Sequence, residues 1–299
     1  MHAFEYSAPH SLSDAVSLLS QANGNAKLLA GGTDLIDQMR TGRFRPALVI
    51  DVKKLAELNL LEFDSDGLHV GAAVTCYRIY DEPDIANDYT ALADACHIIG
   101  GVQIQSRASM GGNLCNSGPA ADSTPAMIAL GGHCVIVGPG ETRQVPVEDF
   151  CTAPGKNVLE RGELLAEILF PPRPANSGSH YRRLIPRNEM DIAVVGVGAS
   201  VELDEDKQTI KSARVALGAV APTPLFAKDV SESLAGKSAT DETFAAAGEA
   251  ARQIVSPIDD MRGTADYRKH ITGVLVKRVL AAATARARGE TINYKAGRD

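Results

Sequence analysis

The chain has 299 residues, and 44% of them are hydrophobic, enough to bury a substantial core and to form two domains of roughly 100–200 residues each. Charged residues make up 22%, near the globular average, which argues against wholesale disorder. Thirty Lys and Arg against 37 Asp and Glu give a formal net charge of −7. General nucleic-acid binders carry a basic surplus or stripe, so this class is disfavoured.

Targeting signals and metal motifs are also missing from the sequence. No apolar run reaches the roughly 18 residues that a membrane span needs. Residues 1–20 lack the basic start and apolar stretch of a secretory signal, so we expect a cytoplasmic protein. The five cysteines contain no Cys-x-x-Cys pair, so we expect free thiols and no metal site on this chain.

The first fifty residues predict alternating elements. An apolar stripe predicts a helix over 11–21, capped by Ser11 or Ser13. Strands are expected at 26–30 and 47–52, with a helix over 33–40 between them. A strand, a helix and a strand within about 30 residues indicate a βαβ unit with parallel strands.

The pattern of predicted helices and strands changes near residue 58. Further strands are expected at 68–74, 134–137 and 164–170, and helices at 84–96 and 124–130. Residues 171–179 hold three prolines, two serines and a glycine, and are predicted to link two domains. We therefore expect a first domain over 1–175, with lobes of about 1–55 and 56–175, and a second over 176–290.

The second half predicts a simpler unit. Strands are expected at 193–203 and 210–220, joined by a polar turn. Three helices follow, at about 229–234, 241–254 and 267–288. A hairpin followed by helices indicates a small α+β domain.

The first candidate site is the segment Leu28-Leu29-Ala30-Gly31-Gly32-Thr33-Asp34-Leu35. A strand ends at two glycines and a helix begins, so free backbone amides and the helix dipole favour an anion such as phosphate. The Asp34 carboxylate would repel a phosphate, so its side chain is expected to bond amides or a ligand hydroxyl. Taken alone, this segment favours an ordinary strand–helix turn with a Thr cap, since short glycine motifs are common.

The second candidate site is the uncharged, small-sided run from Ser109 to Ala121, followed by Asp122. Such a run lets backbone lie against an extended ligand, with Ser109 and Asn113 adding hydrogen bonds. Asp122 could accept bonds from sugar hydroxyls, as the acidic residue of dinucleotide folds does. The alternative is a long glycine-rich loop with Asp122 supporting a helix cap. Neither segment matches the Rossmann or P-loop pattern.

A third segment, residues 180–193, carries arginines that could meet phosphate or a partner's acidic surface, or form surface salt bridges. Tyr181 could lie against a flat ring or pack between domains. The seven histidines form no HxxxH or HxxE cluster, GxSxG is absent, and nothing local activates Cys115. The chemistry is therefore expected to belong to a cofactor.

Together these motifs resemble the FAD-binding medium subunit of the molybdenum hydroxylases, the xanthine dehydrogenase and carbon monoxide dehydrogenase group. The matching segments run in family order over nearly the whole chain. They are Ala30-Gly31-Gly32-Thr33-Asp34-Leu35, residues 103–107 leading into Ser109-Met110-Gly111-Gly112-Asn113-Leu114, Pro119-Ala120-Ala121-Asp122, Glu148-Asp149-Phe150, Gly162-Glu163-Leu164-Leu165, Arg187 with Asp191-Ile192-Ala193, and residues 262–268.

The resemblance implies an α+β fold. It comprises a two-lobed FAD-binding domain of the vanillyl-alcohol oxidase or PCMH type, and a small C-terminal domain of the CO dehydrogenase flavoprotein type with an antiparallel sheet and helices. Noncovalent FAD would lie between the two, with its pyrophosphate at the two glycine turns. The implied FAD-binding residues are Leu28, Leu29, Ala30, Gly31, Gly32, Thr33, Asp34, Leu35, Ile99, Ser109, Gly111, Gly112, Asn113, Asp122, Leu165, Tyr181 and Arg183.

Three departures from the family pattern stand out. The family often has Lys at the position of Arg183, so the charge is kept and the geometry changes. It often has Arg-Asn where Gln105-Ser106 stand here. The cysteine-bearing insertion of the hydroxybenzoyl-CoA reductase type is missing, so no extra iron–sulfur cluster is expected.

The resemblance implies an electron-transfer subunit without a general base. A large partner would hold the molybdenum cofactor, a small partner would relay electrons through iron–sulfur clusters, and FAD here would pass them to NAD, a quinone or another acceptor. A dimer of heterotrimers is expected. Two alternatives stay open, a stand-alone FAD-dependent oxidoreductase of the same fold and a non-enzymatic assembly subunit.

Overall fold

The structure, a computed structural model, describes residues 1–292 and begins with a small parallel sheet. Its strand order is β1-β3-β2, and the parallel pairing of β2 with β3 confirms the predicted βαβ unit. Ser11 caps the first helix, since its Oγ accepts from the amide of Asp14 at 3.1 Å. The elements are β1 (Glu5–Ser7), α1 (Leu12–Gln21), β2 (Ala26–Leu29), α2 (Thr33–Arg40) and β3 (Leu48–Asp51).

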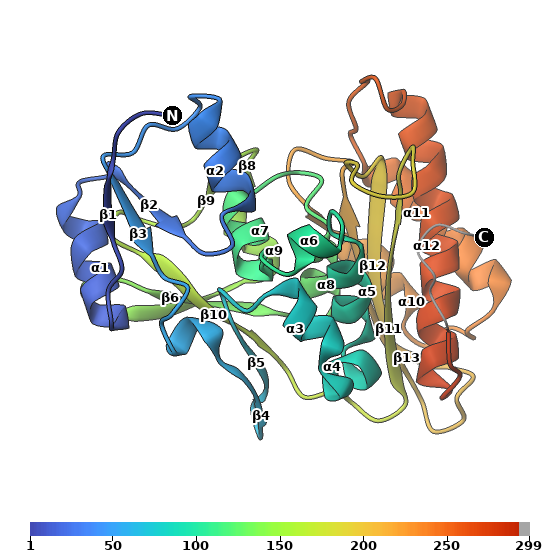
Figure 1. Ribbon diagram of the computed structural model, residues 1–299. Helices are drawn as coiled ribbons and strands as arrows, with labels where there is room; N and C mark the ends of the chain where they lie inside the picture. The colour runs from blue at the N-terminus through green and yellow to red at the C-terminus, as the bar shows by residue number, and fades with distance from the viewer. Residues whose placement is uncertain (293–299) are drawn as a thin grey trace.

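A second lobe is built on a five-stranded antiparallel sheet of order β4-β5-β10-β6-β7. Its strands are β4 (Leu61–Asp64), β5 (Gly67–Gly71), β6 (His133–Val137), β7 (Thr142–Pro146) and β10 (Leu164–Phe170), and a small hairpin joins β8 (Cys151–Ala153) to β9 (Lys156–Asn157). Short helices pack beside this sheet (Figure 1). They are η1 (Glu57–Asn59), α3 (Cys76–Asp81), α4 (Pro83–Asp88), α5 (Thr90–Ile98), α6 (Val102–Gln105), α7 (Met110–Asn116), α8 (Ser123–Ala129) and α9 (Val147–Phe150).

One local prediction for this lobe was wrong, and one alternative interpretation is excluded. The expected helix over 84–96 is divided at Tyr89, whose ψ of 48° departs from helical geometry. The run from Ser109 to Ala121 is not a continuous loop, because residues 110–116 form α7. Ser109 makes this possible, since its Oγ accepts from the amide of Gly112 at 3.1 Å and caps the helix.

The C-terminal part is a four-stranded antiparallel sheet of order β11-β12-β13-β14, covered by helices. Figure 1 shows the long α12 lying along this sheet, beside α11. The elements are β11 (Ser177–Leu184), β12 (Val195–Leu203), β13 (Ile210–Gly218), β14 (Leu225–Phe226), α10 (Lys228–Leu234), α11 (Asp241–Ile254) and α12 (Ala265–Ala287). The described residues contain no helix that is long and apolar enough to cross a membrane.

The predicted linker over 171–179 is too long, because β11 already begins at Ser177. This strand was missed since its residues are polar, yet most of them are buried. Gly178 explains the close packing: a Cβ there would lie 2.3 Å from the carbonyl oxygen of Ala283 in α12. The domain boundary near residue 175 stays a prediction.

A buried ionic cluster joins the second lobe to the C-terminal part. Asp94 of α5 accepts from His180 Nδ1 at 2.7 Å and from two nitrogens of Arg286 in α12, at 2.6 and 3.0 Å. Burial alone would raise the pKa of Asp94, but the hydrogen bonds from His180 and Arg286 prevail and hold it below its usual range. The carboxylate therefore stays ionised between the two parts.

Removing one partner of this cluster should be costly, because the carboxylate would stay buried without its cation. We predict that Arg286→Ala lowers the free energy of unfolding by roughly 3–5 kcal/mol. As a control, Lys228→Ala breaks an exposed pair with Glu232 and should cost about 0.3–0.5 kcal/mol. Urea unfolding measures both; equal losses would contradict the prediction.

The cluster also predicts a pH dependence. A lowered folded-state pKa means that the stability gained from ionised Asp94 is complete above the ordinary carboxyl pKa of about 3.9 and is lost as the pH falls through the lowered folded-state value. Asp94→Asn mimics the protonated carboxyl. The difference in unfolding free energy between the two proteins should therefore be large at neutral pH and shrink as the pH falls below about 3.9. A constant difference in urea titrations would refute this role.

The first lobe contacts the second through backbone at Gly31. A Cβ on Gly31 would lie 2.1 Å from the carbonyl oxygen of Arg107, which is rigid backbone. Gly112 differs, because a Cβ there would meet only Ser109 Oγ, at 3.0 Å. The first position thus requires glycine for lobe contact, whereas at the second the Ser109 hydroxyl would have to shift by only a few tenths of an ångström.

Substitution of Gly31 tests the lobe contact, and the same substitution at Gly112 serves as its control. Gly31→Ala should force the lobes apart and cost about 1–3 kcal/mol of unfolding free energy. Gly112→Ala should change it by less than about 0.5 kcal/mol. Thermal and urea denaturation measure the stability of both variants. A Gly31→Ala protein as stable as wild type would show that the lobe contact is not tight.

Candidate functional site

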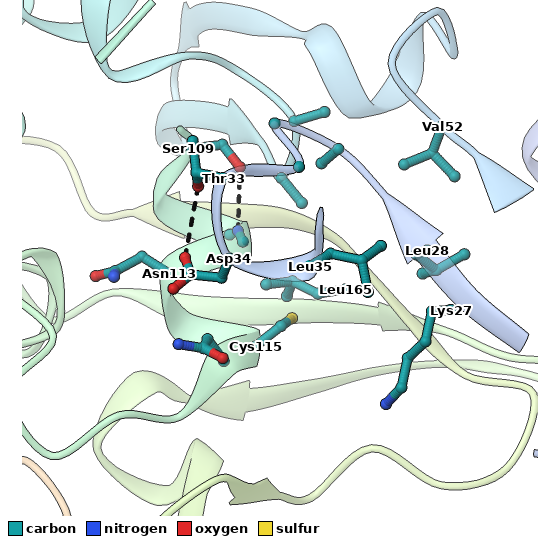
Figure 2. A pocket seen from close by; sticks show the side chains of 18 of the residues that line it. Lys27, Leu28, Thr33, Asp34, Leu35, Val52, Ser109, Asn113, Cys115 and Leu165 are labelled. Carbon is teal, nitrogen blue, oxygen red and sulfur yellow. Dashed lines mark hydrogen bonds between the residues drawn. The ribbon is translucent and has the colours of Figure 1, made fainter. Parts of the chain in front are cut away.

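A cavity of about 880 Å³ lies between the first and second lobes. This volume is at the upper end for ligand pockets and suits an extended molecule. Both glycine segments line it, although about 80 residues separate them in the chain. Figure 2 shows Thr33, Asp34, Ser109 and Asn113 gathered at one end, and Lys27, Leu28 and Val52 towards the other.

The first wall is the turn between β2 and α2. Gly32 has a φ of +78°, which favours glycine, and it begins α2 without a side-chain cap. The first helical hydrogen bond runs from the amide of Ile36 to the carbonyl of Gly32, at 3.1 Å. The amides of the first turn are therefore left for another acceptor. Residues of this segment that line the cavity are Leu28, Ala30, Gly31, Gly32, Thr33, Asp34 and Leu35.

The opposite wall is the start of α7. Gly111 packs against the backbone of Ala72, since a Cβ would lie 2.5 Å from its carbonyl oxygen. Gly112 is exposed towards the cavity. Asn113 is fixed in place because its Oδ1 accepts from Ser123 Oγ at 2.7 Å. Ser109, Gly111, Gly112 and Asn113 all line the cavity, as predicted residues of one site.

Apolar side chains complete the cavity. Leu165 lies on β10 at an irregularity of its pairing with β6, and Ile99 follows α5. Both line the cavity and are largely buried. They offer flat apolar surface to a ring system.

Four of the predicted residues lie outside the cavity lining. Leu29 is on the strand beside it; Asp122, Tyr181 and Arg183 form a buried cluster between the second lobe and β11. Tyr181 Oη donates to Asp122 Oδ1 at 2.8 Å, Arg183 Nη1 donates to Asp122 Oδ2, and Arg183 Nη2 donates to the carbonyl of Ile98 at 2.7 Å. Asp122 adjoins the cavity wall in sequence, through Ser123 and its bond to Asn113.

Opposing effects act on the pKa of Asp122. Burial raises its pKa, while the Arg183 charge and the hydrogen bonds from Tyr181 and Arg183 act in the opposite direction. The net shift is upward.

The cavity also contains residues that the sequence did not single out. Lys27, Arg43 and Lys156 bring positive charge to the end away from the glycines, and Lys27 Nζ lies 4.2 Å from the ring centre of Phe44. The β8–β9 hairpin supplies Gly155 and Asn157. No motif marked these positions, since they reach the cavity only through the way the two lobes pack.

Nucleophilic and metal chemistry find no support in the described part of the chain. Cys115 lines the cavity, but burial, with a smaller effect of Cys151, raises its thiol pKa to about 12 and leaves it protonated. Within residues 1–292, no group of three or more His, Cys, Asp or Glu is placed to hold a metal ion.

Comparisons with known proteins agree with this architecture. Residues 2–173 match the family model "FAD binding domain in molybdopterin dehydrogenase", and residues 179–283 match "CO dehydrogenase flavoprotein C-terminal domain". The chain is 33% identical to a putative xanthine dehydrogenase FAD-binding subunit of Escherichia coli K12, over 96% of this chain and 99% of that one.

Solved structures show the same likeness. Carbon monoxide dehydrogenase of Hydrogenophaga pseudoflava contains a chain 34% identical to this one, with a TM-score of 0.90, covering 95% of this chain and 98% of that one. Quinoline 2-oxidoreductase of Pseudomonas putida 86 contains a chain with 27% identity and a TM-score of 0.87, at the same coverage. With its two glycine turns on one cavity and its C-terminal sheet, the chain belongs to the FAD-binding medium subunits of the molybdenum hydroxylases.

Proposed function

We propose that this chain carries electrons, through noncovalently bound FAD, from iron–sulfur clusters of a small partner subunit to NAD, a quinone or another acceptor. A large partner subunit would oxidise the substrate at a molybdenum cofactor, and the complex would be a dimer of heterotrimers. The observation that carries the proposal is the convergence of both glycine turns on one cavity of about 880 Å³. A cytoplasmic location stays a prediction from the N-terminal sequence.

The cavity suits FAD chemically at three points. Residues at the starts of α2 and α7 line it, and helix N-termini favour the negative charge of a pyrophosphate. The space beside Gly112 lets a ligand approach the backbone. Leu165 and Ile99 provide apolar contact for a ring. When bound, FAD would supply the redox chemistry, since it accepts and releases electrons.

The remaining predicted residues have supporting roles in this proposal. Ser109 and Asn113 would donate or accept hydrogen bonds with FAD oxygens, and Thr33 and Asp34 would bond its hydroxyls or neighbouring amides. Asp122, held by Tyr181 and Arg183, would set the far end of the site. Leu29 would support the first glycine turn, since a Cβ on Gly32 would lie 2.8 Å from its Cδ1.

A carboxylate placed beside a pyrophosphate should repel it. We predict that Gly112→Asp weakens FAD binding at least tenfold, a loss of about 1.4 kcal/mol or more, without preventing folding. Gly140→Asp is the matched control, since Gly140 is in an exposed turn with open space around it. Flavin fluorescence titration of the stripped chain gives both dissociation constants. A wild-type chain that neither retains nor rebinds FAD would overturn the proposed function.

The direction of electron flow gives a second test. In the assembled complex, substrate should bleach the flavin absorption within a turnover, and adding acceptor should restore it. The isolated FAD-loaded chain should not be reduced by the organic substrate, because the proposal places substrate oxidation at the molybdenum cofactor of the large partner subunit. Substrate turnover by the isolated chain would instead support a stand-alone oxidoreductase.

A further inference from the structure

A side-chain hydrogen bond joins the two walls of the cavity. Gln38 of α2 donates through Nε2 to Asn116 Oδ1 of α7, at 3.0 Å. Gln38 belongs to the first lobe and Asn116 to the second, 78 residues further along the chain, and both line the cavity. Figure 1 shows their helices next to each other. The bond therefore crosses from one wall to the other, and we call this pair of residues the clasp.

Asn116 is held in place from within the second lobe. It is the last residue of α7, and Ser117 ends the helix with a left-handed φ of 52°. Ser117 Oγ donates to the carbonyl of Leu114 at 3.0 Å. Asn157 Nδ2 of β9 donates to the carbonyl of Cys115, also at 3.0 Å. The acceptor of the clasp is thus fixed, and any opening must come from separation of α2 from α7.

Other contacts between the two lobes are harder to part than the clasp. Val16 of α1 and Leu164 of β10 belong to one buried apolar cluster, so parting them would expose apolar surface to water. At Gly31 the first lobe lies against the backbone of Arg107. The clasp is a neutral hydrogen bond between two half-buried amides, which water can satisfy when they separate. The α2 edge of the cavity is therefore the edge that can open.

The clasp lies close to where the cofactor would be held. Gln38 is five residues after Thr33 in α2, which places it about 7.5 Å along the helix axis from the first glycine turn. An extended molecule at that turn would have to pass the clasp to enter or leave. We propose that the clasp is a gate, so that FAD enters and leaves the cavity only while the hydrogen bond between Gln38 and Asn116 is broken. This inference rests on the proposed function, because it takes FAD as the ligand.

A gate has a kinetic signature that a binding contact lacks. Both groups of the clasp belong to the chain itself, so their bond holds the walls together whether FAD is inside or outside. Weakening the bond would raise the open fraction of the chain by the same factor in both states. Entry and release of FAD would become faster together, and the dissociation constant, which is their ratio, would stay the same. Loss of a direct contact with FAD would instead speed release and weaken binding.

Substitution of Gln38 by Met tests the gate, since Met keeps the length of the side chain but cannot donate to Asn116. In Gln38→Met, we expect the rates of FAD release and rebinding to rise together by about 2–10-fold, the range for loss of a neutral hydrogen bond. Asn116→Ala should give the same result. The double variant should add nothing further, because either change alone breaks the bond. Chasing labelled FAD with unlabelled FAD gives the release rate, and mixing FAD with the stripped chain gives the rebinding rate.

Gln253→Met is the matched control. Gln253 is exposed on α11, and its Nε2 donates to Glu249 Oε1 at 3.1 Å, so the same substitution removes an amide hydrogen bond away from the cavity. Both rates of this variant should equal those of wild type.

Three results would overturn the gate. They are unchanged rates in Gln38→Met and Asn116→Ala, faster release with unchanged rebinding and weaker binding, or a lowered melting temperature of the stripped variants with weaker binding. The second result would make the pair a direct contact with FAD, and the third would give it a structural role. The proposed function fails in a different way, through a wild-type chain that does not bind FAD, and this inference would then fail with it.

Discussion

Everything at the site depends on close backbone contact between two lobes. Gly31 lies directly on the carbonyl of Arg107, where any side chain would collide with backbone. This contact brings the β2–α2 turn to the start of α7, so that both segments line one cavity. Neither lobe could form such a site alone, because each contributes one wall. The absence of a side chain at one position thus determines the binding geometry.

A buried ionic cluster holds the C-terminal part against the second lobe. The cluster of Asp94, His180 and Arg286 joins α5 to β11 and α12 out of contact with water. Buried ion pairs stabilise less than their Coulomb attraction suggests, because each charge loses its hydration. They do select one arrangement, since any displacement leaves an unpaired charge. The C-terminal part is therefore held in a defined position against the second lobe.

The sequence predicted the helices and strands that are marked by a local pattern of apolar residues and caps. It did not predict elements whose side chains are buried only by contacts with distant parts of the chain. The βαβ unit, β10 and the three C-terminal helices were expected from periodicity and caps and are present. β11 was missed because its polar residues bond to distant partners, as Ser179 does to Thr90. The run after Ser109 resembled a loop because its small residues carry little helical signal, and only the Ser109 cap explains α7. Lys27 and the β8–β9 hairpin reach the cavity through lobe packing, which no local pattern encodes.

The bond between Asn113 and Ser123 has a broader consequence. Asn113 is part of the cavity wall, and Ser123 is the neighbour of Asp122, which binds Tyr181 and Arg183 of β11. A ligand on one side and the C-terminal sheet on the other therefore act on adjacent residues of one short stretch. Thermodynamic linkage is reciprocal, so any free energy by which occupancy of the cavity stabilises docking of the sheet would be returned as tighter binding in the cavity.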